Sequence, residues 1–177
     1  QEGKIRAIGV SNFLPHHLDA LLETARVIPA VNQVRLAPGV YQEEVVDYCR
    51  EKGILLEAWG PFGQGELFQN EQVKEMATKY GKTVAQLALA WSLQEGFLPL
   101  PKSVTPERIA SNLNCFDFEL TADDVELLRQ VHQIQTTKIF KREFLFINEN
   151  RGQFRSRFLK SFQRLNNFKN PIKTDVL

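Results

Sequence analysis

The chain has 177 residues, of which 43% are hydrophobic and 24% are charged, and this composition predicts a globular domain with a sizeable core. No run reaches the roughly 18 apolar residues of a membrane helix, and the first residues lack the apolar segment of a signal peptide. Cys49 and Cys115 do not have the spacing of a metal site. We therefore expect a cytoplasmic protein with no membrane contact and two buried thiols.

The net charge of +1 hides an uneven distribution along the chain. Residues 1–137 are acidic overall, whereas residues 138–177 carry ten Lys and Arg against three Asp and Glu, together with seven of the 13 Phe. This change predicts one domain at residues 1–132 and a basic, Phe-rich tail at residues 133–177. Such a tail is compatible with binding to nucleic acid or an anionic membrane, but a disordered or foreign extension explains it more simply, and we expect neither partner.

Four apolar segments are predicted to be buried strands, each followed by a loop and a helix. They are residues 5–10, 31–36, 54–59 and 97–100. Leucines at helical spacing follow the first strand, and a helix over residues 42–52 ending at Gly53 follows the second. Two helices follow the third strand, the first ending at Gly81 and the second beginning with a capping box of Thr83 and Gln86. The alternation predicts parallel strands, either in a doubly wound sheet or in a (β/α)₈ barrel.

The fourth strand leads into a helix start that resembles an anion site. Thr105 is expected to cap the helix, with Pro106 as its first residue, and the N–H groups of such an end favour phosphate. Lys102 precedes this cap and Arg108 lies one turn into the helix, so both cations could reach the same ligand. The alternative is an ordinary turn with a solvated Lys and Arg. A last helix is predicted from Thr121, with Asp124 as the partner in its capping box.

Polar residues fall at or near the carboxyl end of each predicted strand. They are Ser11 with Asn12, Gln33, Trp59 with Gly60, and Lys102 with Ser103. Taken singly, each has a simpler explanation: a helix cap for Ser11 and Asn12, a satisfied core amide for Gln33, and plain core for Trp59. Because the carboxyl ends of barrel strands meet on one face, their equivalent positions favour the barrel. The glycines from Gly60 to Gly65 do not match the dinucleotide-binding pattern of a doubly wound sheet.

Several segments together resemble the second half of an aldo-keto reductase, an NADPH-dependent α/β enzyme with the (β/α)₈ TIM barrel fold. They are Ile8-Gly-Val-Ser-Asn-Phe13, Val31-Asn-Gln-Val34, Glu57-Ala-Trp-Gly-Pro61, Gly63-Gln-Gly65, Pro101-Lys-Ser-Val-Thr-Pro-Glu-Arg-Ile109 with Asn112, and Phe116-Asp-Phe-Glu-Leu-Thr121. The resemblance covers residues 1–132. It implies that the chain carries only about the last four βα units of the barrel.

The resemblance implies a site for NADP (NADPH) along these segments. Ser11, Asn12 and Gln33 would hold the nicotinamide carboxamide, and Trp59 would stack on the ring. The loop along the pyrophosphate would be Gly60, Pro61, Phe62, Gly63, Gln64 and Gly65. The adenosine end would be bound by Lys102, Ser103 and Arg108 around the 2′-phosphate, with Val104 and Thr105 nearby and Asn112 on the adenine. The chain departs from the family pattern at Gly60 (often Ser), Ser111 (often Glu), and Arg35 and Ala37 (usually Glu and His).

The family's catalytic Asp, Tyr, Lys and His belong to the first four βα units, so we assign no catalytic residue here. Tyr41, Tyr48 and Tyr80 are not substitutes. The chain begins with Gln, and its only Met is Met76, so we expect the gene product to start further upstream. The chain alone is then expected to be inactive, to act on a small-molecule carbonyl substrate only when an N-terminal half completes it, and to self-associate through open barrel edges. The alternative is a non-catalytic remnant or interaction protein that acts through its tail.

Overall fold

The structure is a computed structural model, and it describes residues 5–131. The chain divides into two units, residues 1–134 and residues 135–177, and every described residue belongs to the first. The predicted tail at residues 133–177, with the function suggested for it, therefore lies outside the described residues.

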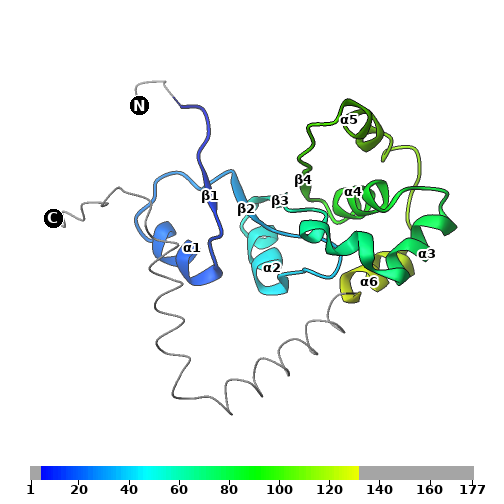
Figure 1. Cartoon of the computed structure of the whole chain (residues 1–177). Helices are drawn as coiled ribbons and strands as arrows, with labels where there is room; N and C mark the ends of the chain where they lie inside the picture. Colours follow the sequence, from blue (N-terminus) through cyan, green and yellow to red (C-terminus); the bar gives the residue numbers. More distant parts are fainter. Residues whose placement is uncertain (1–4, 132–177) are drawn as a thin grey trace, which may run out of the picture. The chain divides into compact units, whose positions relative to one another are not determined.

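Four parallel strands form one sheet in which the order in space follows the order in the chain (Figure 1). They are β1 (Gly9–Ser11), β2 (Val31–Arg35), β3 (Leu55–Trp59) and β4 (Leu98–Leu100). Strand pairing aligns Gly9 with Val31, Val31 with Leu55, and Glu57 with Leu98. A doubly wound sheet would reverse this order at its switch point, whereas a barrel adds each strand beside the last. The topology therefore favours the barrel over the doubly wound alternative.

The first strand is shorter than predicted, because residues 5–8 do not join the sheet. Ile5 is 72% exposed, and among the described strands β1 pairs with β2 alone, so it forms an edge of this sheet. Gly9 allows the close approach of the two strands, since a Cβ at this position would lie 2.5 Å from Cγ2 of Val31. The apolar residues before Gly9 predicted a buried strand. Their burial would require a second strand on the other side of β1.

The helices follow the predicted alternation. They are α1 (Pro15–Leu22), α2 (Glu43–Glu51), α3 (Glu71–Lys79), α4 (Val84–Gln94), α5 (Pro106–Leu113) and α6 (Ala122–Gln130), with a 3₁₀ segment, η1 (Gly63–Gln69), that the sequence did not predict. The capping box of Thr83 and Gln86 is confirmed, because each side chain accepts the other residue's backbone N–H at 3.2 and 2.9 Å.

The capping box predicted for α6 is only half formed. Thr121 Oγ1 accepts the N–H of Asp124 at 3.3 Å, but the Asp124 carboxylate accepts from Lys79 and Tyr80 instead of the Thr121 N–H. The Thr121 N–H donates to the Tyr80 hydroxyl at 3.1 Å. The expected reciprocal bond fails because α3 offers Asp124 a cation and a hydroxyl.

Among residues 5–131, helices cover one face of the sheet and none covers the other. On the covered face, Val34, Leu56 and Ala58 are buried, and Trp91 of α4 is fully enclosed. The opposite face carries the alternate residues, and its apolar members Leu55, Leu98 and Leu100 are 46%, 43% and 40% exposed. Parallel sheets are normally covered on both faces, and in a barrel the second face is filled by side chains from the remaining strands.

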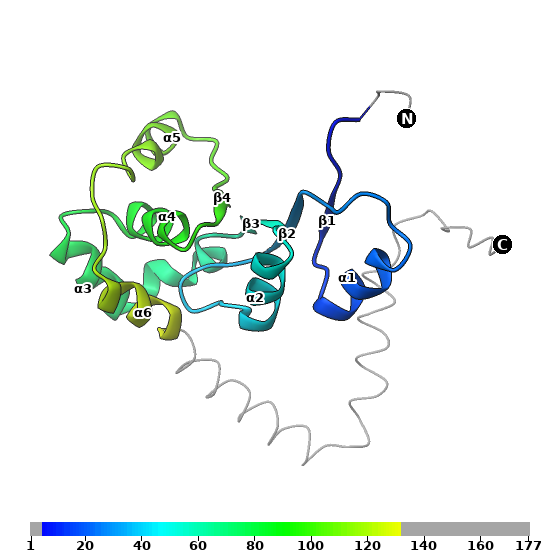
Figure 2. The same ribbon diagram turned by 180° about the vertical axis from the view of Figure 1, so that it is seen from behind.

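Within the described range, β1 and β4 each pair with a strand on one side only. In both views α1 and α5 lie at opposite ends of the four strands (Figures 1 and 2). No residue of α5 is buried, although Ile109 and Leu113 give it an apolar side. Within residues 5–131 both cysteines are free and buried, as predicted, and no helix is long and apolar enough to cross a membrane.

Candidate functional site

Four of the predicted site residues form a polar cluster at the carboxyl ends of β1, β2 and β3. The Trp59 indole N–H donates to Asn12 Oδ1 at 3.1 Å, and the Asn12 amide donates to Ser11 Oγ at 3.2 Å. Ser11 Oγ in turn donates to the backbone carbonyl of Gln33 at 3.1 Å. Trp59 is half-buried and is therefore not plain core. The structure brings Ser11, Asn12, Gln33 and Trp59 together, as the sequence predicted.

The position of this cluster is set by the chain just after β1. Asn12 has a φ of 56°, in the left-handed region that Asn tolerates better than most residues. Asn32, a fully buried residue of β2, donates from its side-chain amide to the Phe13 carbonyl at 2.9 Å and accepts the Phe13 N–H at 3.3 Å. The N-cap of α1 is Leu14. The alternative explanation of Ser11 and Asn12 as a helix cap is therefore wrong.

Gln33 points to the open face and makes a side-chain contact that was not predicted. Its Nε2 donates to Glu57 Oε2 at 2.9 Å, while the side-chain oxygen of the same amide, Oε1, makes no hydrogen bond within residues 5–131 and can accept one. Glu57 could have been found from the sequence, because it lies two residues before Trp59 and strand residues two apart share a face. Gln33 is half-buried and is not an amide of the helix-covered core.

The predicted pyrophosphate loop turns sharply after β3. Gly60, Gly63 and Gly65 have φ values of 63°, 57° and 98°, which glycine adopts without strain. Added Cβ atoms at Gly60 and Gly65 would meet nothing within 4 Å, so backbone conformation and not packing calls for glycine at these two positions. The N–H groups of Gly63 and Gly65 donate within the loop to the carbonyls of Gly60 and Phe62, both at 2.9 Å.

Most of the residues predicted to bind the adenosine end of the cofactor line one pocket of about 580 Å³. Its lining includes Lys102, Ser103, Val104, Arg108 and Asn112, together with Phe62 of the loop after β3. Sequence reasoning had assigned no binding role to the other lining residues, Phe68, Thr83, Ala85 and Ser111. Phe62 and Phe68 lie with ring centroids 5.8 Å apart and give the pocket an aromatic wall that no local sequence signal indicates.

The charge of this pocket is positive and uncompensated. Among residues 5–131, no carboxylate pairs with Lys102 or Arg108. Thr105 precedes α5 as predicted, but its side chain caps nothing and it does not line the pocket. Ser103 Oγ accepts the Thr105 N–H at 3.2 Å instead. Lys102 and Arg108 thus bring two positive charges to the lining of one pocket, which favours an anionic ligand.

The three tyrosines lie outside both groups of residues. The Tyr41 hydroxyl accepts from Arg50 Nη1 at 3.1 Å, and burial raises its pKa above 10.0. Tyr48 donates to Asp19, and Tyr80 donates to Asp124. In the described part of the chain, no group of His, Cys, Asp and Glu could hold a metal ion. Within residues 5–131, none of the three tyrosines therefore belongs to the polar cluster or to the lining of the pocket.

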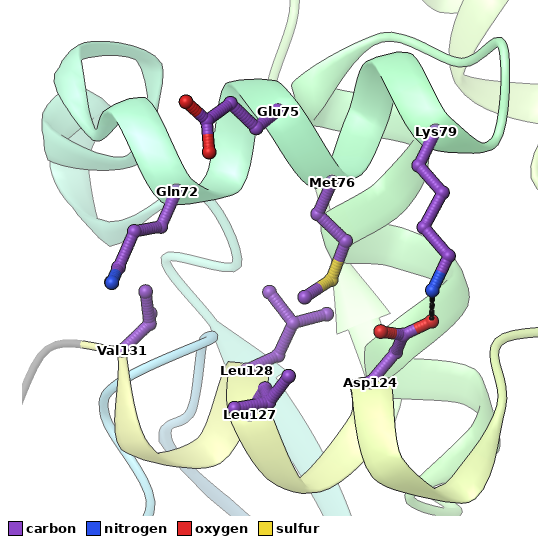
Figure 3. A pocket seen from close by; sticks show the side chains of 8 residues that line it. All are labelled: Gln72, Glu75, Met76, Lys79, Asp124, Leu127, Leu128 and Val131. Carbon is purple, nitrogen blue, oxygen red and sulfur yellow. Dashed lines mark hydrogen bonds and ion pairs between the residues drawn. The ribbon is translucent and has the colours of Figure 1, made fainter.

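A second groove, of about 330 Å³, lies between α3 and α6 (Figure 3). Met76 and Leu128 line it, and its cation, Lys79, already pairs with Asp124 at 2.7 Å. Glu75 adds a further negative charge. This groove does not suit an anionic ligand, and it contains none of the predicted cofactor residues.

Comparison with known proteins identifies the family to which the chain is similar. The model of the aldo/keto reductase family matches residues 1–133. A glyoxal reductase from Bacillus subtilis is 45% identical over 82% of this chain and 53% of that relative, and an aldehyde reductase from Saccharomyces cerevisiae is 41% identical over 77% and 44%. A crystal structure of a Bombyx mori aldo-keto reductase in complex with NADP has a TM-score of 0.66 and 34% identity, covering 71% of this chain and 44% of that one. The chain thus spans about half the length of these relatives.

Proposed function

The chain belongs to the aldo/keto reductase family, and we propose that it is the NADP-binding half of an enzyme that reduces aldehydes or ketones to alcohols. The observation that carries this proposal is the pocket in which Lys102 and Arg108 converge without a carboxylate partner. The sheet, four consecutive parallel strands with one open face, is consistent with half of the (β/α)₈ barrel of the family.

The residues present fit the adenosine end of NADP. Lys102 and Arg108 would supply charge for the 2′-phosphate, which NAD lacks, and Phe62 and Phe68 would provide an apolar wall for the adenine. Asn112 lines the same pocket and offers an amide to the base. The fit is therefore chemical. Two cations match a dianionic phosphate, and aromatic and amide groups match a heterocyclic base.

The polar cluster at the strand ends fits the nicotinamide end. The side-chain oxygen of Gln33 can accept a hydrogen bond, and Ser11 offers a hydroxyl. Together these two groups suit the donor and acceptor atoms of a carboxamide. The hydrogen bond from Trp59 to Asn12 fixes the plane of the indole, so its face can orient a flat ring. When bound, the cofactor supplies a hydride to the carbonyl carbon. None of the three tyrosines reaches this cluster, so residues 5–131 place no tyrosine hydroxyl where it could donate a proton to the carbonyl oxygen.

Cofactor titration tests the proposal directly. The chain of 177 residues is titrated with NADPH and with NADH while tryptophan fluorescence is followed, and a Trp59→Ala variant identifies the responding indole. We expect tighter binding of NADPH, with a fluorescence change that is lost in the variant. Equal affinity for the two cofactors, or no binding of either, would contradict the proposed function.

A further inference from the structure

Arg35 is a half-buried cation on the open face of the sheet, at the carboxyl end of β2. Its Nε is buried and has no hydrogen-bond partner. The residue is one of the departures from the family pattern, which usually has Glu here. An Arg in this position therefore places a positive charge where the pattern predicts a negative one.

The structure offers Arg35 no carboxylate. Its guanidinium makes no ion pair with any residue from 5 to 131. Glu57 shares the open face, but its carboxylate accepts from Gln33 and does not pair with Arg35. Other cations of the described part that lack an ion pair, such as Arg26 and Lys102, are exposed and can be solvated by water. A partly desolvated guanidinium without a carboxylate partner is unfavourable, so a bound anion would stabilise Arg35 in this position.

The location of Arg35 connects it with the nicotinamide end of the site. Strand pairing sets Arg35 beside Trp59, and the guanidinium carbon lies 6.0 Å from the centroid of the indole, at the outer limit of a cation–π contact. Gln42 donates to the Arg35 carbonyl at 2.8 Å and so holds the backbone at this strand end. An anion bound by Arg35 would therefore lie next to the ring that Trp59 orients.

We propose that Arg35 binds an oxyanion beside Trp59, either a carboxylate of the carbonyl substrate or the pyrophosphate of the cofactor. The inference rests on the proposed function, because both anions belong to the proposed ligands. The planar fork of a guanidinium matches the two oxygens of either group. A carboxylate assignment would make 2-oxo acids a substrate class of the completed enzyme.

The test uses isothermal calorimetry on the 177-residue chain with three probes: inorganic pyrophosphate, pyruvate, and methyl pyruvate as the neutral analogue. Arg35→Gln is compared with Arg26→Gln, which removes an exposed, unpaired Arg from the loop before β2. We expect Arg35→Gln to weaken one of the two anions about tenfold, and Arg26→Gln to leave both nearly unchanged. Weaker pyruvate with unaltered methyl pyruvate assigns the substrate carboxylate, whereas weaker pyrophosphate assigns the cofactor.

The inference is overturned if Arg35→Gln and Arg26→Gln behave alike, or if the unmodified chain binds neither anion. Circular dichroism checks that Arg35→Gln is folded. If it is not, Arg35→Lys replaces it, since Lys keeps the charge but loses the fork: weaker binding of one anion then supports the inference, and unchanged binding of both overturns it. NADPH binding with no Arg35 effect contradicts only the anion site, whereas anion binding through Arg35 without NADPH binding contradicts the proposed function.

Discussion

Arg129 of α6 donates two parallel hydrogen bonds, of 2.6 and 2.8 Å, to the buried carboxylate of Glu95 at the end of α4. The Glu95 side chain is 1% exposed. Arg50 of α2 approaches the same residue, donating to its carbonyl at 2.7 Å. Three helices are thus tied together at the start of β4, the end of the sheet opposite the polar cluster. Such contacts at the amino ends of barrel strands serve stability.

Arg129→Leu should therefore lower the free energy of unfolding by about 2–4 kcal/mol, because the buried Glu95 carboxylate then keeps only the longer, 3.4 Å ion pair with Arg50. Urea unfolding followed by circular dichroism measures the change. Lys74→Met, which breaks the exposed pair with Glu71, is the control and should cost less than about 0.5 kcal/mol. A similar loss in both variants would show that Glu95 is not held by its ion pair.

Asp124 should make the domain sensitive to acid. Hydrogen bonds from Lys79 and Tyr80 hold its pKa below the ordinary value of 3.8. A carboxyl with a lower pKa in the folded state stabilises fully above the unfolded pKa, and this stabilisation is lost as the pH falls below about 4. Asp124→Asn should thus be less stable at pH 7 and lose less stability between pH 5 and pH 3. Parallel pH profiles of the two proteins would contradict this role.

Lys102→Ala should discriminate between the two cofactors. If the ammonium group contacts the 2′-phosphate, its removal should weaken NADPH binding about tenfold, equivalent to about 1.4 kcal/mol, and leave NADH binding nearly unchanged. Fluorescence titration with each cofactor gives both affinities. Lys74→Ala, on the exposed side of α3, controls for the loss of one positive charge. Equal weakening of NADPH and NADH would mean that Lys102 does not read the phosphate.

Local patterns in the sequence predicted the helices more closely than the sheet. The stripe of Val45, Val46 and Cys49 is buried as its spacing indicated, because a helix face is encoded within a dozen residues. The length of β1 was not predictable in this way, since burial of Ile5 depends on a strand that would lie beyond the sheet edge. The reciprocal cap expected of Asp124 failed for the same reason: its partners come from a distant helix.

The candidate site shows the same division. Lys102 and Arg108 were predicted to converge, because both flank one helix start. The aromatic wall of Phe62 and Phe68 closes the same pocket from another βα unit, and it emerges only when the chain is folded. The lack of a hydrogen-bond partner for Arg35 Nε is likewise seen only in the folded chain, because the sequence around Arg35 does not indicate which carboxylates lie near it.

The last prediction concerns the chain by itself. Its sheet has an edge at β1, an edge at β4 and an open face on which Leu98 is 43% exposed, and unpaired parallel strands pair readily with another chain. We expect the 177-residue chain to be oligomeric by light scattering, and to oxidise no NADPH above background with aldehydes or 2-oxo acids. Leu98→Lys should shift it toward monomer because it charges the open face, whereas Leu127→Lys, at an exposed position of α6, should not. A monomer with NADPH turnover would mean that this half supplies its own proton donor and covers its own edges, which is contrary to the geometry of its tyrosines and its strands.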